Sequence, residues 1–145
     1  MENALALDEM VCFQAYTLHH AFGRHYQAAF AGTGLTYAKY VVLKALQERE
    51  KMSLTELSAR LGVEPNTLSP LSRKMAGCGT IERVRDREDE RRIVLRLTPR
   101  GLDLLKQADV IAAEKFAALG ISAEETAQAV ALMSRLRTAL EGSVP

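Results

Sequence analysis

The stretch SLTELSARLGVEPNTLSPLSRKMAGCG, residues 53–79, carries the clearest indication of the fold. Its first half predicts a short helix, because Ser53 and Glu56 can form a capping box, leucines recur at helical spacing and Gly62 can end the helix. After a short turn, Pro65 suits the first position of a second helix. Two short helices joined by a tight turn are typical of a helix-turn-helix unit, although any two capped helices give the same pattern.

The beginning of the second helix carries small polar side chains that can approach DNA closely. In a helix-turn-helix this helix enters the major groove, and its N-terminal amides favour phosphate. Asn66, Thr67 and Ser69 could therefore reach base edges or phosphates. Arg73 and Lys74 follow a turn or two later, where they could reach the DNA backbone.

The next segment changes to the period of β-strands. TIERVR (80–85) and RRIVLRLT (91–98) are strand-like, the second with Ile93, Leu95 and Leu97 on one face, and DREDE (86–90) lies between them. Five of the ten residues in 83–92 are Arg, the side chain that suits a narrow minor groove, and an adjacent carboxylate could orient one guanidinium. A solvated charged turn has the same composition, but a helix-turn-helix followed by a basic hairpin predicts a winged helix.

Helices flank this unit on both sides. Asp8 can cap a helix extending to about residue 31, and Thr36 can cap the helix before the quoted stretch. Thr98-Pro99 begins a long helix, and Ser122 with Glu125 begins the last one, which extends to about residue 142. The expected fold is mainly α with a small β wing.

Composition is that of an ordinary globular domain. The chain has 145 residues, 48% of them hydrophobic and 26% charged, which suits one domain over residues 1–145. No apolar run could span a bilayer, and residues 1–10 lack signal-peptide features, so we expect a cytoplasmic protein. Residues 73–92 hold seven Lys/Arg against five Asp/Glu, whereas 101–145 hold four against six, which favours a polyanionic partner for the middle of the chain.

Residues 57–105 resemble the core of MarR-type winged-helix repressors, whose wing commonly ends in Asp-x-Arg, as in Asp89-Glu90-Arg91. The N-terminal CFQAY at Cys12, with GLTYAKY at residues 34–40, is similar to the organic-hydroperoxide-sensing branch, the OhrR repressors. Members of that branch carry a reactive cysteine in a Cys-Phe-x-x-Tyr motif. The resemblance implies a homodimer, with helices 8–31 and 99–142 forming the dimer interface and residues 36–98 binding DNA.

The resemblance also implies roles for individual residues. Cys12 matches the reactive cysteine, and Tyr26 and Tyr37 match two tyrosines whose hydroxyls hydrogen-bond its thiolate. Arg91 matches the minor-groove arginine, and Asp89 matches the carboxylate that holds it. The residues that match the recognition-helix motif are Thr67, Ser69, Pro70 and Arg73.

This sequence departs from the family pattern at two places. Ala38 stands where a proline is usual, and Glu64-Pro65-Asn66 replaces the usual Asp-Ser-Gly. Pro65 has no N–H to donate to a phosphate, so this departure bears on DNA contacts. No resolving cysteine lies in the C-terminal third, since Cys78 precedes the wing.

Cys12 has a second interpretation, because a lone cysteine on a helix is usually a small buried hydrophobe. Tyr16 and His19 share its helical face, whereas Tyr26 lies about 21 Å along a straight helix. Only an antiparallel second copy of the helix could bring Tyr26 to Cys12, which agrees with a two-fold dimer.

The remaining metal-binding or redox candidates have simpler interpretations. Cys78 is interpreted as a small residue at a helix end. The spacings of His19, His20 and His25 do not place three ligands on one face, so neither a metal nor another cofactor is expected.

The residues and the family resemblance together imply a non-enzymatic, dimeric DNA-binding repressor that releases its operator when an organic hydroperoxide oxidises Cys12. Oxidised Cys12 could then form a mixed disulfide with a small thiol or a cyclic sulfenamide. One alternative is a repressor of the same fold gated by a small phenolic or aromatic acid, with Cys12 merely lining the pocket. A broader alternative is a general thiol-based oxidant sensor. A peroxidase-like thiol enzyme is the alternative from another class, but no catalytic His/Asp partner or cofactor loop is present in the sequence.

Overall fold

The computed structural model describes residues 5–143. The chain forms two compact units that divide between Ala112 and Ala113. The first unit holds α1 (Val11–Ala29), α2 (Tyr37–Gln47), α3 (Leu54–Leu61), α4 (Pro65–Gly77), most of α5 (Pro99–Ala117) and the strands β1 (Met52–Ser53), β2 (Ile81–Arg85) and β3 (Ile93–Leu97). The second unit holds the end of α5 and helix α6 (Ala123–Ser143). The expected fold class, mainly helical with a small β wing, is confirmed.

The helix-turn-helix forms from the predicted local signals. The Ser53 hydroxyl accepts from the Glu56 amide at 3.1 Å, and the Glu56 carboxylate accepts from the Ser53 amide at 2.7 Å, which completes the capping box of α3. Gly62 ends α3 in the left-handed conformation at φ 65°, and Pro65 occupies the first turn of α4. The end and the beginning of the two helices are thus specified locally.

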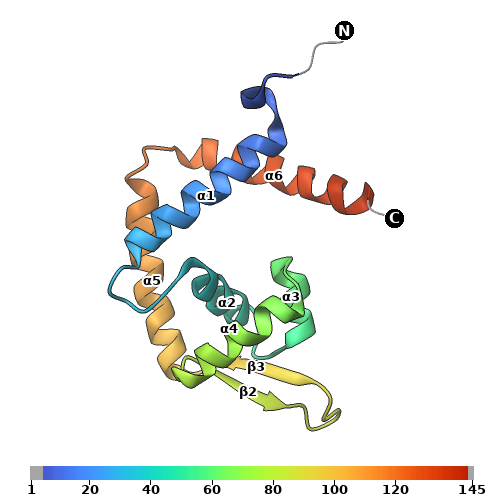
Figure 1. The fold of residues 1–145 in the computed structure, drawn as a ribbon. Helices are drawn as coiled ribbons and strands as arrows, with labels where there is room; N and C mark the ends of the chain where they lie inside the picture. The colour runs from blue at the N-terminus through green and yellow to red at the C-terminus, as the bar shows by residue number, and fades with distance from the viewer. Residues whose placement is uncertain (1–4, 144–145) are drawn as a thin grey trace. The chain divides into compact units, whose positions relative to one another are not determined.

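The wing is a three-stranded antiparallel sheet in the order β1-β3-β2. Strands β2 and β3 pair from Ile81 with Leu97 to Arg85 with Ile93, and this hairpin emerges beside α4 (Figure 1). The two-residue strand β1 was not predicted, because it is too short to show an alternating pattern.

The apolar face predicted for β3 is present, since Leu95 belongs to the buried core and both Ile93 and Leu97 pack against that core. Leu95 is fully buried, but Val94 on the opposite face is buried as well, whereas Ile93 and Leu97 are only half-buried. The reason is the position of β3: it is the central strand, and Val94 lies between Ser53 of β1 and Val84 of β2.

The N-terminal helix begins later than predicted, and Asp8 does not cap it. The Glu9 carboxylate accepts from the Ala6 amide at 3.0 Å and closes a separate 3-10 turn, Leu7–Glu9. Met10 is then extended, so α1 starts at Val11 without a side-chain cap. The other predicted caps are present: Thr36 accepts from Lys39, and Ser122 with Glu125 forms the capping box of α6.

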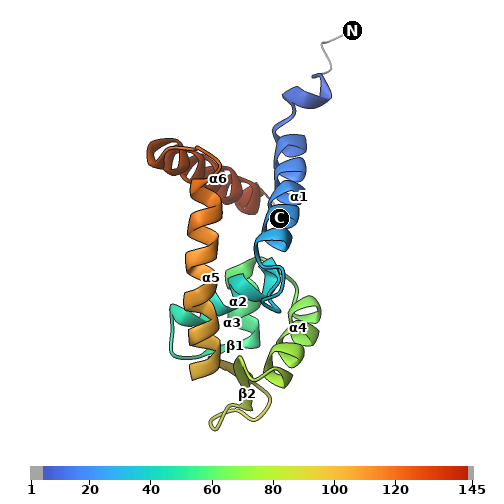
Figure 2. The same ribbon diagram turned by 90° about the vertical axis from the view of Figure 1, so that its left-hand side faces the viewer.

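The core of the first unit lies between α2, α3, α4, the sheet and the first part of α5. Its largest fully buried side chains include Phe30, Leu43, Leu57, Leu68 and Leu95. Figures 1 and 2 show α2 beside α5, and a glycine tightens the contact between α5 and the sheet. A Cβ on Gly101 would lie 1.9 Å from the Thr80 carbonyl oxygen, so only glycine fits there.

Candidate functional site

The beginning of α4 presents the predicted DNA-contacting residues to solvent. Asn66, Thr67 and Pro70 are exposed, and Ser69 is half-buried. One turn later Arg73 and Lys74 are exposed, and the Arg73 guanidinium donates to the Ser69 hydroxyl at 3.2 Å. Two basic side chains and several small polar groups therefore share the accessible part of this helix.

Arg83 on β2 is a residue that the sequence analysis missed. Its guanidinium donates to the Ser72 hydroxyl at 2.6 Å and to the Ser69 carbonyl at 3.1 Å. Burial, and then the nearby positive charge of Arg73, hold the pKa of Arg83 below its usual value. Arg83 thus links strand β2 of the wing to α4 through these hydrogen bonds. The one available signal is the alternation of the strand, which puts Arg83 on the same face as the buried Ile81, and in the structure Arg83 is half-buried between exposed Glu82 and Val84.

The wing tip, residues 86–92, is organised by its own backbone. The Asp89 carboxylate accepts from the Arg91 amide at 3.0 Å, and the Arg92 amide donates to the Asp89 carbonyl at 2.9 Å. Asp89 was expected to hold the Arg91 guanidinium. Within residues 5–143 it holds the Arg91 backbone instead, because the tight turn places that amide over the carboxylate.

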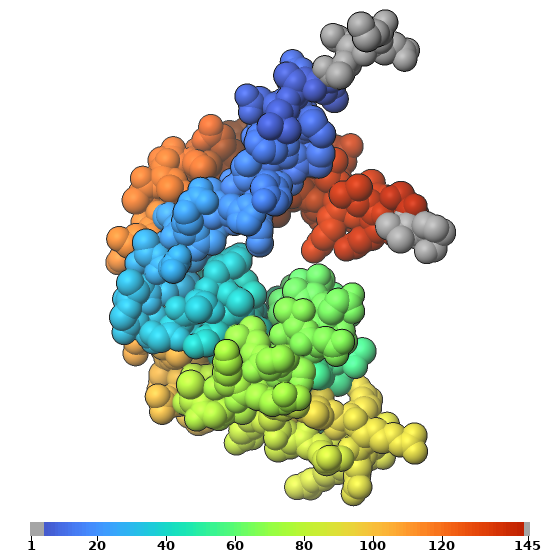
Figure 3. All heavy atoms as spheres, viewed as in Figure 1, coloured from blue at the N-terminus to red at the C-terminus, as the bar shows by residue number. Residues whose placement is uncertain are grey.

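The Arg91 side chain is exposed on this turn and has no ion-pair partner among the described residues. Arg92 reaches the Glu56 carboxylate on α3 at 3.7 Å, which links the wing to the other helix of the motif. Figure 3 shows the wing, in yellow, as a narrow projection beyond α4. The Arg91 side chain is therefore accessible at the tip of the wing.

Cys12 is the second residue of α1, and its side chain is exposed. Large apolar neighbours on the same helix are exposed as well: Val11 at 61%, Tyr16 at 63% and Leu18 at 38%. An exposed apolar surface of this kind commonly marks an interaction face. The cysteine is therefore not a core residue of the isolated protomer.

Tyr26 and Tyr37, the two residues that the resemblance assigns to the thiolate, lie side by side. Their rings stack with centroids 4.6 Å apart, and Tyr40 lies 6.2 Å from Tyr26 in the same cluster. Burial, followed by the neighbouring Tyr37, raises the pKa of Tyr26. Tyr26 remains a neutral donor at physiological pH, which is the form that can hydrogen-bond an anion.

Cys12 lies away from this cluster within one protomer. Tyr26 lies fourteen positions after Cys12 in α1, which is about 21 Å along the helix axis. The structure therefore joins the two tyrosines but does not join them to the cysteine of the same chain.

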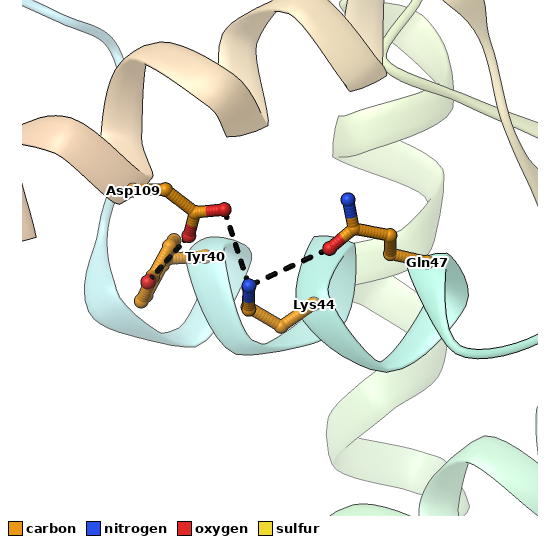
Figure 4. A network of polar contacts seen from close by, with 4 residues as sticks. All are labelled: Tyr40, Lys44, Gln47 and Asp109. Carbon is orange, nitrogen blue, oxygen red and sulfur yellow. Dashed lines mark hydrogen bonds and ion pairs between the residues drawn. The ribbon is translucent and has the colours of Figure 1, made fainter.

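Tyr40 is anchored to α5 through a polar network that sequence reasoning did not identify (Figure 4). Its hydroxyl donates to the Asp109 carboxylate at 2.8 Å, and Lys44 donates to the other carboxylate oxygen at 3.1 Å. Burial and then the Asp109 hydrogen bond raise the pKa of Tyr40. Because the Tyr40 hydroxyl already donates to Asp109, its ring is held in place beside Tyr26 and Tyr37.

The remaining residues considered as redox or metal-binding candidates are Cys78 and the histidines of α1. Cys78 is exposed at the C-terminal cap of α4. His19 and His20 lie with ring centroids 5.7 Å apart, and no three His, Cys, Asp or Glu side chains within residues 5–143 could hold one metal ion. The same part of the chain contains no helix that is long and apolar enough to cross a membrane.

Comparison with known proteins identifies the fold and the family. The MarR family model matches residues 35–93. The regulator TtmR of Methylorubrum extorquens is 38% identical over 76% of this chain, although the chain spans only 56% of its length. The organic hydroperoxide resistance transcriptional regulator of Bacillus subtilis is 30% identical over 97% of this chain and 96% of its own.

A solved structure agrees with these relatives. The PcaV transcriptional regulator of Streptomyces coelicolor, in complex with its natural ligand, superposes with a TM-score of 0.84 at 25% identity, over 95% of this chain and 99% of PcaV. The two relatives found by sequence and the solved PcaV structure are all transcriptional regulators rather than enzymes. The chain therefore belongs to the MarR family and is a winged-helix transcriptional regulator.

Proposed function

We propose that this regulator is a homodimeric repressor that releases its operator when an organic hydroperoxide oxidises Cys12. The exposed thiol of Cys12 is the observation that carries the proposal, because a peroxide must reach a sensing sulfur. The full-length match to the hydroperoxide regulator of Bacillus subtilis supports the same effector.

A dimer would complete the sensing site. The exposed apolar side chains on α1 need a covering surface, and α6 carries more of them: Val130, Leu132, Met133, Leu136 and Leu140. A second α1 packed antiparallel would bring Tyr26 of the partner subunit near Cys12, together with Tyr37 stacked on it. Two phenolic hydroxyls could then donate to the Cys12 thiolate.

The chemistry of sensing is a transfer of oxygen to sulfur. The Cys12 thiolate attacks the terminal oxygen of ROOH, a sulfur–oxygen bond forms, and the peroxide O–O bond breaks. The leaving alkoxide takes a proton and departs as ROH, so the sulfur is oxidised and the peroxide is reduced. The Cys12 sulfenic acid can then condense with a small thiol, releasing water and leaving a mixed disulfide, or with a backbone nitrogen to give a cyclic sulfenamide.

The winged helix supplies the DNA-binding surface in this proposal. The first part of α4, with Asn66, Thr67, Ser69 and Pro70, enters the major groove, and Arg73 and Lys74 contact phosphates. Arg91 enters the adjacent minor groove from the wing tip that Asp89 shapes. Oxidation at the dimer interface would change the spacing between the two winged helices, so that they no longer match successive half-sites.

The rate of Cys12 sulfenic acid formation tests the tyrosine site. Mass spectrometry after one equivalent of cumene hydroperoxide, with and without a small thiol, should show oxidation at Cys12. Tyr26→Phe and Tyr37→Phe should each slow it by roughly ten- to a hundredfold, since a hydrogen bond to a charged group contributes about 1.5–3 kcal/mol.

Tyr40→Phe is the matched control, because it removes a hydroxyl from the same cluster that already donates to Asp109. It should leave the oxidation rate near that of the parent. Equal rates for the parent, Tyr26→Phe and Tyr37→Phe would remove the tyrosines from the sensing site.

A further inference from the structure

Glu64 stands at the beginning of the recognition helix α4 and has no role in the proposed DNA contacts. It is the N-cap residue of α4, in an extended conformation at φ −70° and ψ 144°, and its side chain makes no cap hydrogen bond. The side chain is exposed and forms no ion pair within residues 5–143. An accessible carboxylate therefore lies at the end of α4 that, in the proposed function, enters the major groove.

The basic side chains of the helix-turn-helix do not offset this negative charge. Arg60 of α3 donates to the Glu48 carboxylate at 2.8 Å, and Arg73 of α4 donates to the Ser69 hydroxyl at 3.2 Å. Lys74 follows Glu64 by ten residues, which is about 15 Å along the helix axis. The carboxylate of Glu64 thus remains an unpaired hydrogen-bond acceptor in the described part of the motif.

The same end of α4 offers few backbone donors to a phosphate. Helix N-termini commonly bind phosphate through the amides of their first turn. Here Pro65 has no N–H, and the amides of Thr67 and Leu68 both donate to the Glu64 carbonyl, at 2.9 and 3.1 Å. The Asn66 amide is the one that remains in this turn. One amide beside a carboxylate disfavours a phosphate at this position.

A carboxylate suits one kind of base edge in the major groove. It can only accept hydrogen bonds, and the donors in that groove are the N4 amino group of cytosine and the N6 amino group of adenine. Adenine also presents its N7 acceptor beside the amino group, and this lone pair repels a carboxylate. Cytosine has a C–H at the corresponding place. A carboxylate therefore favours cytosine over adenine.

We propose that Glu64 is a specificity-determining residue that accepts a hydrogen bond from the amino group of one cytosine in each half-site. Its charge also repels phosphates and so lowers binding to DNA of other sequences. This inference rests on the proposed placement of α4 in the major groove, and it names a base contact that this placement alone does not give. Neither Cys12 nor its oxidation state takes part.

The first test selects duplexes from a pool with a random centre of about 24 base pairs, enough for two half-sites one helical turn apart. The reduced parent should enrich cytosine at one symmetric pair of positions. Glu64→Gln should enrich adenine there instead, because an amide can bond both N6 and N7, and the other positions should stay unchanged. Glu50→Gln is the matched control: it removes another exposed carboxylate, between α2 and β1, and should keep the parent's preference.

The second test removes the donor from the DNA. In a base pair, the methyl group of N4-methylcytosine occupies the place of the hydrogen that faces the major groove. This base in the selected site should weaken binding by the parent by roughly five- to a hundredfold. Glu64→Ala should bind the methylated and unmethylated duplexes nearly equally, since it has no acceptor to lose. An equal loss of affinity in both proteins would overturn the proposal.

The charge of Glu64 is tested with duplexes of unrelated sequence at low salt. Glu64→Gln should bind them roughly two- to fivefold more tightly than the parent, because one repulsion from phosphate is removed. Unchanged affinity would exclude this effect.

Thr67→Ala distinguishes failure of this inference from failure of the proposed function. If Thr67→Ala alters the selected bases and Glu64→Gln does not, Glu64 reads no base although α4 lies in the groove. If neither substitution alters any base preference, α4 does not read DNA, and both proposals are wrong.

Discussion

Replacing Arg83 by alanine tests how the wing supports the recognition helix. The Arg83 guanidinium donates to the Ser72 hydroxyl at 2.6 Å and to the Ser69 carbonyl at 3.1 Å, so both bonds connect β2 with α4. Arg83→Ala removes them together and leaves the remainder of the hairpin pairing intact.

The loss of stability depends on whether the removal of Arg83 leaves a buried polar group without a hydrogen-bond partner. The buried Ser72 hydroxyl still donates to the Ser69 carbonyl at 2.8 Å, so neither group is stranded without a partner. The cost should therefore be near the net value of a hydrogen bond, about 1–1.5 kcal/mol, rather than the larger cost of an unpaired buried group. For a chain of this size that corresponds to a fall of roughly 2–6 °C in Tm.

Thermal unfolding followed by circular dichroism measures the stability change, and operator titration measures the effect on DNA binding. Affinity should fall by up to about fivefold, the factor that corresponds to roughly 1 kcal/mol, because α4 loses its fastening to the wing. Arg85→Ala is the control for stability, since Arg85 lies on the same strand but donates only to the exposed Glu90 carbonyl. If Arg83→Ala and Arg85→Ala unfold at the parent's temperature, Arg83 does not position α4.

Three further substitutions probe the helix cap and the DNA contacts. Hydrogen bonds from the Ser53 backbone and then its side chain hold the pKa of Glu56 below its usual 4.5, so this stabilisation is present at neutral pH and is lost as pH falls through the lower folded pKa. The parent should therefore lose more unfolding free energy than Glu56→Gln between about pH 5 and pH 3 in urea denaturation, and parallel curves would exclude the effect. Arg91→Ala should weaken binding most at operators with A·T-rich flanks, whereas Arg73→Ala should lower the slope of log affinity against log salt by about 0.9 for a lost phosphate contact. Unchanged affinity of Arg91→Ala would remove the wing from the DNA interface.

The sequence predicts the winged helix well because its signals are local. Ser53 with Glu56, Gly62 and Pro65 each specify a helix end within a few residues, and the structure places all four as expected. Asp8 shows the limit of such signals: Glu9 competes by reaching back to Ala6, and the chain forms a separate turn.

The contacts that the sequence analysis did not predict join segments that lie far apart in the chain. Arg83 reaches Ser72 across the helix–strand boundary, and Asp109 meets Tyr40 sixty-nine residues earlier. No local pattern encodes which arginine or aspartate makes such a contact, because the choice depends on how α4, α2 and α5 pack. The shared role of Tyr26 and Tyr37 came from the family resemblance rather than from spacing. Their rings stack at 4.6 Å, and their contact with the Cys12 thiolate stays a prediction.

Operator release by the parent, Cys12→Ser and Cys78→Ser after one equivalent of cumene hydroperoxide tests whether Cys12 is the sensing thiol. Serine keeps the size of cysteine but lacks its nucleophilic sulfur, so all three reduced proteins should bind the operator with similar affinity. The parent and Cys78→Ser should dissociate on oxidation, whereas Cys12→Ser should stay bound. Normal dissociation of Cys12→Ser, or loss of the response in Cys78→Ser alone, would contradict the assignment of Cys12.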